Sequence, residues 1–66
     1  MAVAKVTEIT AESTKSFEDA IEQGIQRATT SLHGIKGAWV KEQKVTVEDG
    51  KIASYRVDLK VTFILD

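Results

Sequence analysis

The chain has 66 residues, a formal net charge of −1 and no cysteine. A chain of this length forms one domain at most, so residues 1–66 are expected to be a single domain. The near balance of nine basic and ten acidic residues argues against a nucleic-acid binder, which would carry a basic surface. Disulfides, thiolate metal sites and multi-histidine zinc sites are all excluded by the composition. Association with further copies is therefore the expected means of stabilising so small a core.

The sequence shows no feature of a membrane or secreted protein. No apolar run approaches the roughly 20 residues of a membrane span, and residues 1–10 lack the pattern of a secretory signal. A cytoplasmic location is therefore predicted, with no membrane partner. The four glycines form no phosphate-binding loop, and no spacing suggests an activated nucleophile. We expect a protein that is not an enzyme.

The first predicted element is a strand over residues 3–10, VAKVTEIT, which are rich in β-branched side chains. Val6 and Ile9 would fall on opposite faces of this strand, so either a bulge or burial of both faces is expected.

A helix is predicted to follow. The Ser16 hydroxyl can cap its first turn, and Glu18 and Asp19 suit the positive end of the helix dipole. Gly34 is expected to end the helix, with His33 beside it. Apolar residues at helical spacing form one stripe over about four turns: Phe17, Ala20, Ile21, Gly24, Ile25, Ala28 and Leu32.

Two further strands are predicted, over residues 38–47 and 52–65. The Asp49–Gly50 pair between them predicts a tight hairpin, because both turn residues need a positive φ. The last strand alternates strictly and should be central. Its apolar face comprises Ala53, Tyr55, Val57, Leu59, Val61, Phe63 and Leu65.

The element order predicts an α+β fold, in which a three-stranded antiparallel-type sheet of order 1-3-2 is wrapped on one helix. The first two strands would be parallel and joined by a right-handed crossover. A helix of about 17 residues spans ~25 Å, whereas a strand of about 14 residues spans ~46 Å. The end of the apolar face, with Val61, Phe63 and Leu65, is therefore expected to stay uncovered and to bind further copies.

The opposite face of the sheet is predicted to be polar and to hold the single tryptophan. Its expected members are Trp39, Lys41, Gln43, Arg56, Asp58 and Lys60. A polar face with one tryptophan suits a wet interface or a ligand site between subunits. Arg56 is expected to bridge Asp58 or Glu42 across strands, or to bind a phosphate. No metal ligands are assigned, although carboxylates such as Glu42, Glu48, Asp49 and Asp58 could bind Ca²⁺ or Mg²⁺ where copies meet.

Six segments, in this order and spacing, resemble the dodecin family over the whole chain: KVTEIT, STKSFEDAI, IQRA, VKEQ, EDGKI and YRVDLKVTFIL. The resemblance implies a β-α-β-β subunit that assembles into a hollow homododecamer. It also implies flavin binding, which many members show.

The resemblance places a candidate flavin site on the second and third strands. In flavin-binding members a tryptophan opens the second strand, and pairs of these side chains sandwich two flavin rings across a twofold axis. An alignment without gaps puts Gly37 at that position and Trp39 two residues later, on the same face and ~6.6 Å along the strand. A family glutamine is replaced by Arg56, whereas the acidic residue before Gln43 is kept as Glu42. The implied site is Trp39, Gly37, Glu42, Gln43 and Arg56, with the stacking position altered.

Two functions follow from this reading. The first is a storage shell that binds a flavin, FMN or riboflavin. The alternative is a dodecin-type shell that binds no flavin and instead holds another small ligand or a metal ion, or serves as a scaffold.

Overall fold

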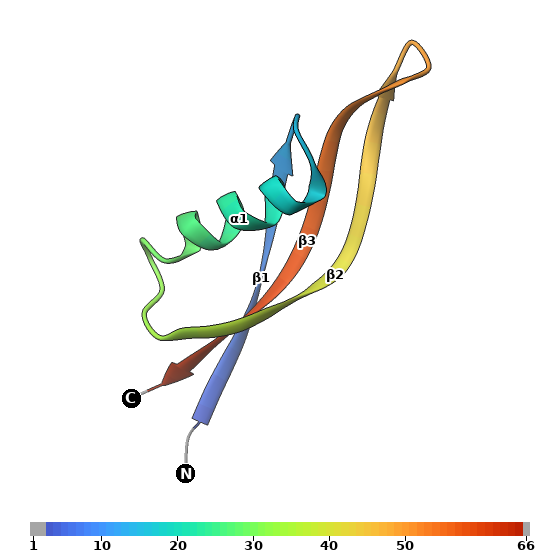
Figure 1. Ribbon diagram of the computed structural model, residues 1–66. Coiled ribbons are helices and arrows are strands. Elements are labelled where there is room, and N and C mark those ends of the chain that lie inside the picture. Colours follow the sequence, from blue (N-terminus) through green and yellow to red (C-terminus); the bar gives the residue numbers. More distant parts are fainter. Residues whose placement is uncertain (1–2, 66) are drawn as a thin grey trace.

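The computed structural model describes residues 3–65, which form three strands and one helix (Figure 1). The elements are β1 (Val3–Ser13), α1 (Phe17–Ala28), β2 (Ile35–Glu48) and β3 (Lys51–Leu65). β3 lies between β1 and β2 and pairs antiparallel with both, so the sheet order is β1-β3-β2. The predicted α+β fold and strand order are therefore confirmed.

β1 is longer and more regular than predicted. It pairs with β3 in one unbroken register, from Val3 opposite Leu65 to Ser13 opposite Tyr55. Val6 is 46% exposed, on the face away from α1, whereas Ile9 packs against the core. The expectation of a bulge or of two-sided burial in this strand was wrong, because Val6 simply points to the polar side of the sheet.

The start of α1 is as predicted. The Ser16 hydroxyl accepts a hydrogen bond from the Asp19 backbone N–H at 3.0 Å, which satisfies one of the free donors of the first turn. Glu18 and Asp19 occupy that turn. Ser13 also donates a hydrogen bond to the Asp19 carboxylate, and this bond ties the end of β1 to the helix.

The end of α1 differs from the prediction. The helix stops at Ala28, with Thr29 as its C-cap. The hydroxyls of Thr29 and Thr30 donate to the carbonyls of Gln26 and Arg27 at 2.6 and 2.7 Å, and such bonds compete with helix continuation. Leu32 and His33 therefore lie in the following loop.

Gly34 has a different role from the predicted one. Its φ is 73°, and a Cβ there would meet the Ile64 carbonyl oxygen at 3.3 Å. Its own carbonyl accepts from the Ile64 N–H at 3.0 Å. Gly34 thus holds the loop against β3 rather than capping the helix.

The core lies between α1 and the central strand. Ala20, Val57, Leu59 and Val61 are buried, and a ring of partly buried side chains surrounds them: Ile9, Ala11, Phe17, Ile21, Ile25 and Ile35. A Cβ at Gly24 would lie 3.0 Å from the Ala11 Cβ, so glycine allows the helix to approach β1 closely. The expectation that Val61 stays uncovered was wrong, whereas Leu65 is 47% exposed.

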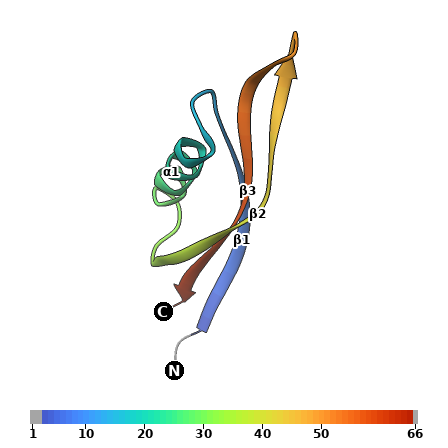
Figure 2. The same ribbon diagram turned by 45° about the vertical axis from the view of Figure 1, so that its right-hand side comes forward.

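The helix covers only part of the sheet. α1 has 12 residues and β3 has 15, which correspond to roughly 18 and 50 Å. α1 lies on one side of the sheet, and the β2–β3 hairpin extends past it (Figure 2). Asp49 and Gly50 form its turn with φ of 51° and 74°, as predicted. Within residues 3–65 no helix has the length and hydropathy needed to cross a membrane.

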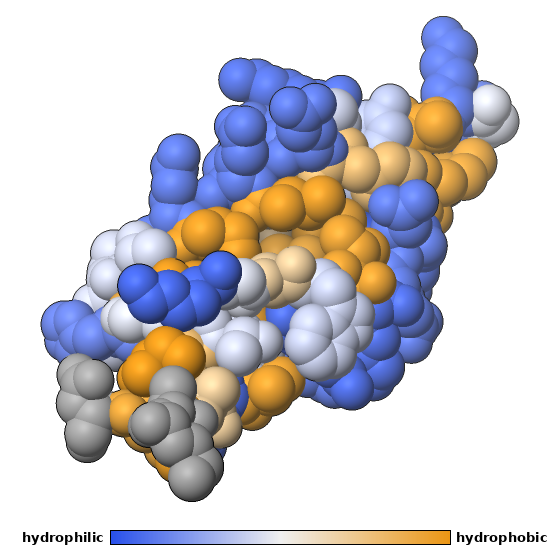
Figure 3. All heavy atoms as spheres, turned by 60° about the horizontal axis from the view of Figure 1, so that its bottom comes forward, coloured by the Kyte–Doolittle hydropathy of each residue, from blue (hydrophilic) through white to orange (hydrophobic). Residues whose placement is uncertain are grey.

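The projecting hairpin exposes apolar side chains. Val47 and Ile52 lie opposite each other near its tip and are 61% and 53% exposed, and Val40 further along β2 is 41% exposed. We call Val40, Val47 and Ile52 the apolar arm. Figure 3 shows apolar atoms gathered in a band between hydrophilic margins. Apolar surface of this kind is typical of an interaction site.

We predict that Leu59→Asp prevents folding. Leu59 is 1% exposed at the centre of the core, where an unpaired carboxylate is strongly unfavourable. Far-ultraviolet circular dichroism should show loss of native structure. Val3→Asp is the matched control, because Val3 is 59% exposed at the start of β1. Native spectra for both variants would contradict the face assignment of β3.

Candidate functional site

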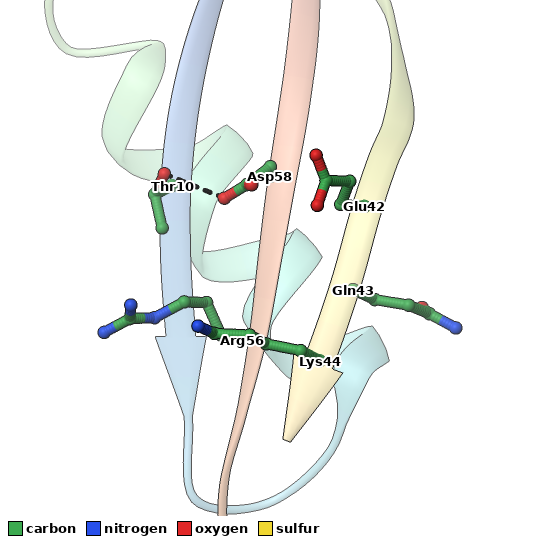
Figure 4. Close-up of a pocket in the computed structure, with 6 residues that line it drawn as sticks. All are labelled: Thr10, Glu42, Gln43, Lys44, Arg56 and Asp58. Atoms are coloured by element: carbon green, nitrogen blue, oxygen red, sulfur yellow. Dashed lines mark hydrogen bonds between the residues drawn. The ribbon is translucent and has the colours of Figure 1, made fainter. Parts of the chain in front are cut away.

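The candidate site lies on the sheet face away from α1, here called the polar face. Three consecutive cross-strand rows occupy it. They are Glu8–Lys60–Trp39, Thr10–Asp58–Glu42 and Glu12–Arg56–Lys44, each in the order β1, β3, β2. Figure 4 shows the second row, Thr10, Asp58 and Glu42, and two residues of the third, Arg56 and Lys44, on the three strands.

A bulge in β2 determines which side chains belong to this face. Val40 pairs with Leu59 and Glu42 with Asp58, so Lys41 is an extra residue between them. The alternation of β2 is shifted by one residue beyond the bulge. Glu42 and Lys44 therefore join Trp39 on the polar face.

The placement of Gln43 on the polar face was wrong for the same reason. Gln43 lies opposite Val57, whose side chain is buried under α1. Its side chain points away from the other five residues in Figure 4. Of the residues proposed from the sequence, the structure brings Glu42 and Arg56 into neighbouring rows and puts Gly37 and Trp39 further along the same face.

Trp39 offers an open aromatic surface. It is 51% exposed, and the Lys60 ammonium lies 5.6 Å from its ring centroid, within range of a cation–π interaction. Gly37 lies one step along the same face, opposite Thr62. Within residues 3–65, nothing lies within 4 Å of where a Cβ on Gly37 would be. Trp39 and the open backbone at Gly37 are therefore neighbouring positions on the polar face.

Two carboxylates face each other in the second row. Asp58 and Glu42 are directly opposite on β3 and β2, and the Thr10 hydroxyl donates to Asp58 Oδ1 at 3.0 Å. Like charges in this arrangement destabilise a sheet. Within residues 3–65, no basic side chain lies within ion-pair distance of either carboxylate. We call Glu42 and Asp58 the acidic row.

Two basic side chains face each other in the third row. Arg56 Nη2 pairs with Glu12 Oε1 at 3.3 Å, so the expected pairing of Arg56 with Asp58 or Glu42 was wrong. The reason is the register, which puts Glu12 directly opposite Arg56. Among the described residues, the buried Arg56 Nε has no hydrogen-bond partner, and Lys44 forms no ion pair. We call Lys44 and Arg56 the basic row.

The first row is already neutralised within the chain. Lys41, the bulged residue, reaches across β3 and pairs with Glu8 Oε1 at 3.3 Å. Lys60 lies over the Trp39 ring. In the acidic and basic rows, by contrast, Glu42, Asp58 and Lys44 form no ion pair with any residue of the described range 3–65.

A shallow hollow of about 140 Å³ lies over the acidic and basic rows. Its lining includes Thr10 and Lys44, which were not proposed from the sequence. If β2 alternated strictly, Lys44 would lie on the α1 side of the sheet. It lies on the polar face because of the bulge at Lys41. Within residues 3–65 there is no cluster of three or more His, Cys, Asp or Glu side chains that could hold a metal ion.

Several known proteins are similar to this chain in sequence and fold. Residues 3–66 match the family model described as Dodecin. A calcium dodecin of Mycobacterium tuberculosis is 38% identical over 63 residues, which span 96% of this chain and 89% of the relative.

Solved structures agree with that match. The dodecin from Streptomyces davaonensis has a TM-score of 0.93 at 37% identity, covering 98% of this chain and 96% of that one. The structure of a calcium dodecin from Mycobacterium tuberculosis, described as calcium-chelating, has a TM-score of 0.83 at 40% identity and covers 97% and 91%. The family model spans nearly the whole chain, and these relatives are similar to the chain in sequence and fold. The chain therefore belongs to the dodecin family.

Proposed function

We propose that this protein is the subunit of a homododecameric shell that binds a flavin, FMN or riboflavin, on the polar face. The observation that carries the proposal is the half-exposed Trp39 beside the empty space at Gly37. An indole in this setting can stack on a planar ring, because offset aromatic pairs are favourable at centroid distances of about 4.5–7 Å. The role is binding and storage without catalysis.

The surroundings of Trp39 indicate how a ring would bind. Lys60 lies 5.6 Å from the indole centroid and occupies one side of the ring, so a ligand would stack on the other side. Gly37 leaves room for a ring edge next to the backbone. The nearby ammonium and the basic row favour a ligand with negative charge, such as FMN, over a neutral one.

Self-association is supported by two independent features. A core of four fully buried apolar residues is small for an isolated domain, and Val47 and Ile52 of the apolar arm are exposed on the hairpin that extends past the helix. The dodecamer is the assembly that family membership implies. A cytoplasmic location stays a prediction.

Calcium is a second candidate ligand. The chain is 38% identical to a calcium dodecin, and the acidic row with Thr10 collects oxygen atoms of the kind that Ca²⁺ binds. One chain supplies too few ligands for the usual six to eight oxygens. A calcium site would therefore need carboxylates from more than one copy.

We predict a homododecamer that depends on the apolar arm. Light scattering at micromolar concentration should give the mass of twelve subunits. Val47→Lys together with Ile52→Lys should lower that mass, because two charges would replace exposed apolar contacts, while circular dichroism stays native. The control is Glu48→Lys, which adds a lysine to the same hairpin at an exposed position. A single-subunit mass for the unmodified protein would rule out the shell.

We predict that the protein binds flavin weakly and that substitutions at Gly37 and Trp39, both on β2, change the affinity. Titration of FMN or riboflavin, followed by flavin and tryptophan quenching, should show Gly37→Trp tightening binding by roughly tenfold, since an added stacking pair and its buried area are worth about 1–2 kcal/mol. Trp39→Ala should abolish the quenching without changing the mass.

Trp39→Phe is the matched control for this titration, because it keeps a ring at the same position. No binding by Gly37→Trp would count against flavin as the ligand. Tight binding by the unmodified protein, lost in Trp39→Ala, would instead show that Trp39 itself takes the place of the family tryptophan.

We predict that any calcium affinity depends on the acidic row. Calorimetric titration with calcium chloride should show binding that falls at least tenfold in Glu42→Gln and in Asp58→Asn, because each removes a charged ligand. Glu48→Gln, an exposed acid on the hairpin, should bind like the unmodified protein. Equal affinity in all three variants would remove the acidic row as the calcium site.

A further inference from the structure

The first row of the polar face contains an unexpected pairing. Lys60 on β3 lies directly opposite Glu8 on one side and directly opposite Trp39 on the other. A lysine normally pairs with a carboxylate in this position, because opposite charges on facing strands stabilise a sheet. Within residues 3–65, however, Lys60 forms no ion pair, and its ammonium lies 5.6 Å from the Trp39 ring centroid.

The bulge in β2 explains this arrangement. Lys41 is the extra residue, and its ammonium reaches Glu8 Oε1 at 3.3 Å. The carboxylate opposite Lys60 is therefore already paired. The other neighbour of Lys60 in this row is the indole, whose face attracts an ammonium within a range of ~6 Å.

We propose that Lys60 determines which rings can bind to Trp39, and that Lys41 holds Lys60 in position by occupying Glu8. Lys60 covers one face of the indole and places a positive charge near the open face. That face then accepts planar rings with an anionic or carbonyl-bearing edge and disfavours cationic rings. The inference rests on the proposed ring site at Trp39 and names the residues that control its selectivity.

The order of charges along the polar face supports this sign of selection. Lys60 shares the row of Trp39, whereas the acidic row lies one step away, ~6.6 Å along the strands. The basic row follows directly after the acidic row and offsets its charge at longer range. The ammonium in the same row as the indole therefore has the largest effect on a ring stacked there.

Collisional quenching of tryptophan fluorescence tests this placement without a flavin. Trp39 is the single tryptophan, so the emission reports on this site alone. Iodide and caesium ions probe the charge at the indole, and neutral acrylamide probes how much of the ring is open. The ratio of iodide to caesium quenching should fall at least threefold in Lys60→Ala, because a unit charge ~6 Å away changes the local concentration of an ion by about that factor.

Lys60→Ala should also open the second face of the indole. Acrylamide quenching should rise roughly twofold, because both faces of the ring become accessible. Lys60→Arg is the conservative control, since a guanidinium keeps the charge and stacks on an aromatic face, and both readings should match those of the unmodified protein. Lys15→Ala, at an exposed position before α1, controls for the loss of a lysine elsewhere. Circular dichroism should confirm native structure in every variant.

Lys41→Gln tests the role of the bulged residue. The substitution frees Glu8, which should pair with the directly opposite Lys60 and draw the ammonium off the indole. Acrylamide quenching should then rise toward the level of Lys60→Ala. The unpaired charge of Glu8 alone would leave quenching by a neutral molecule unchanged. The double variant Lys41→Gln/Glu8→Gln lacks the competing carboxylate and should return acrylamide quenching to the level of the unmodified protein.

The same variants report on ligand selection. Lumiflavin and proflavine are planar molecules of three fused rings, but lumiflavin is neutral with two carbonyl groups, whereas proflavine is a cation. Opening the second face of the indole affects both molecules alike, so the ratio of their affinities isolates the effect of charge. In fluorescence titrations, Lys60→Ala should shift this ratio toward proflavine by about threefold, and Lys60→Arg should leave it unchanged.

Each outcome bears on a separate part of the proposal. Equal quenching of the unmodified protein and Lys60→Ala by all three quenchers would overturn the placement of Lys60. Unchanged acrylamide quenching in Lys41→Gln, or no restoration in the double variant, would overturn the role of Lys41. An unchanged affinity ratio in Lys60→Ala would overturn the selection of rings by charge. Absence of ring binding in every variant would overturn the proposed function and the selectivity that rests on it, whereas the quenching differences would persist.

Discussion

The mismatch in length between the helix and the central strand shapes the whole molecule. α1 has 12 residues and packs on β1 and β3, while β3 runs for 15 residues through the middle of the sheet. Gly24 lets the helix approach Ala11 of β1 closely, but the helix is too short to cover the β2–β3 hairpin. The molecule is therefore 51 Å long and only 19 by 14 Å across. A chain of this shape leaves apolar side chains such as Val47 and Ile52 exposed, which is one of the two features behind the proposed self-association.

The bulge at Lys41 has a corresponding effect on the polar face. By shifting the alternation of β2, it puts Glu42 opposite Asp58 and Lys44 opposite Arg56 on the exposed side. Without the bulge, Gln43 would lie on the polar face, and the two charged rows would not exist. One inserted residue thus creates an acidic row beside a basic row on the polar face, while Lys41 itself reaches Glu8.

The fold could be predicted from the sequence because the patterns that specify its strands, helix and hairpin are local and regular. The alternation of β3 marks the buried face at Val57, Leu59 and Val61, and the Asp49–Gly50 turn specifies the hairpin. The site was predicted less well, because its composition depends on pairing. The bulge leaves no residue-type signature in β2, and the partner of Arg56 is set by the register of β1, forty-four positions away in sequence. The helix ends earlier than predicted, where the hydroxyls of Thr29 and Thr30 bond to carbonyls of its last turn. The spacing of apolar residues carries no information about such bonds.

The altered position of the tryptophan and the charged rows can be understood together. In the flavin-binding pattern that the sequence resembles, the aromatic residue stands where this chain has Gly37, and the ring contact there is between copies. Here the backbone at Gly37 is bare, and the indole lies one step closer to the acidic row, with Lys60 on one side. Moving the aromatic side chain by one step would disturb a stack that requires two rings at a fixed separation, which is why Gly37→Trp is expected to tighten binding. The charged rows begin one step beyond the displaced indole, so a ring stacked on Trp39 would lie next to Glu42 and Asp58 as well as to Lys60.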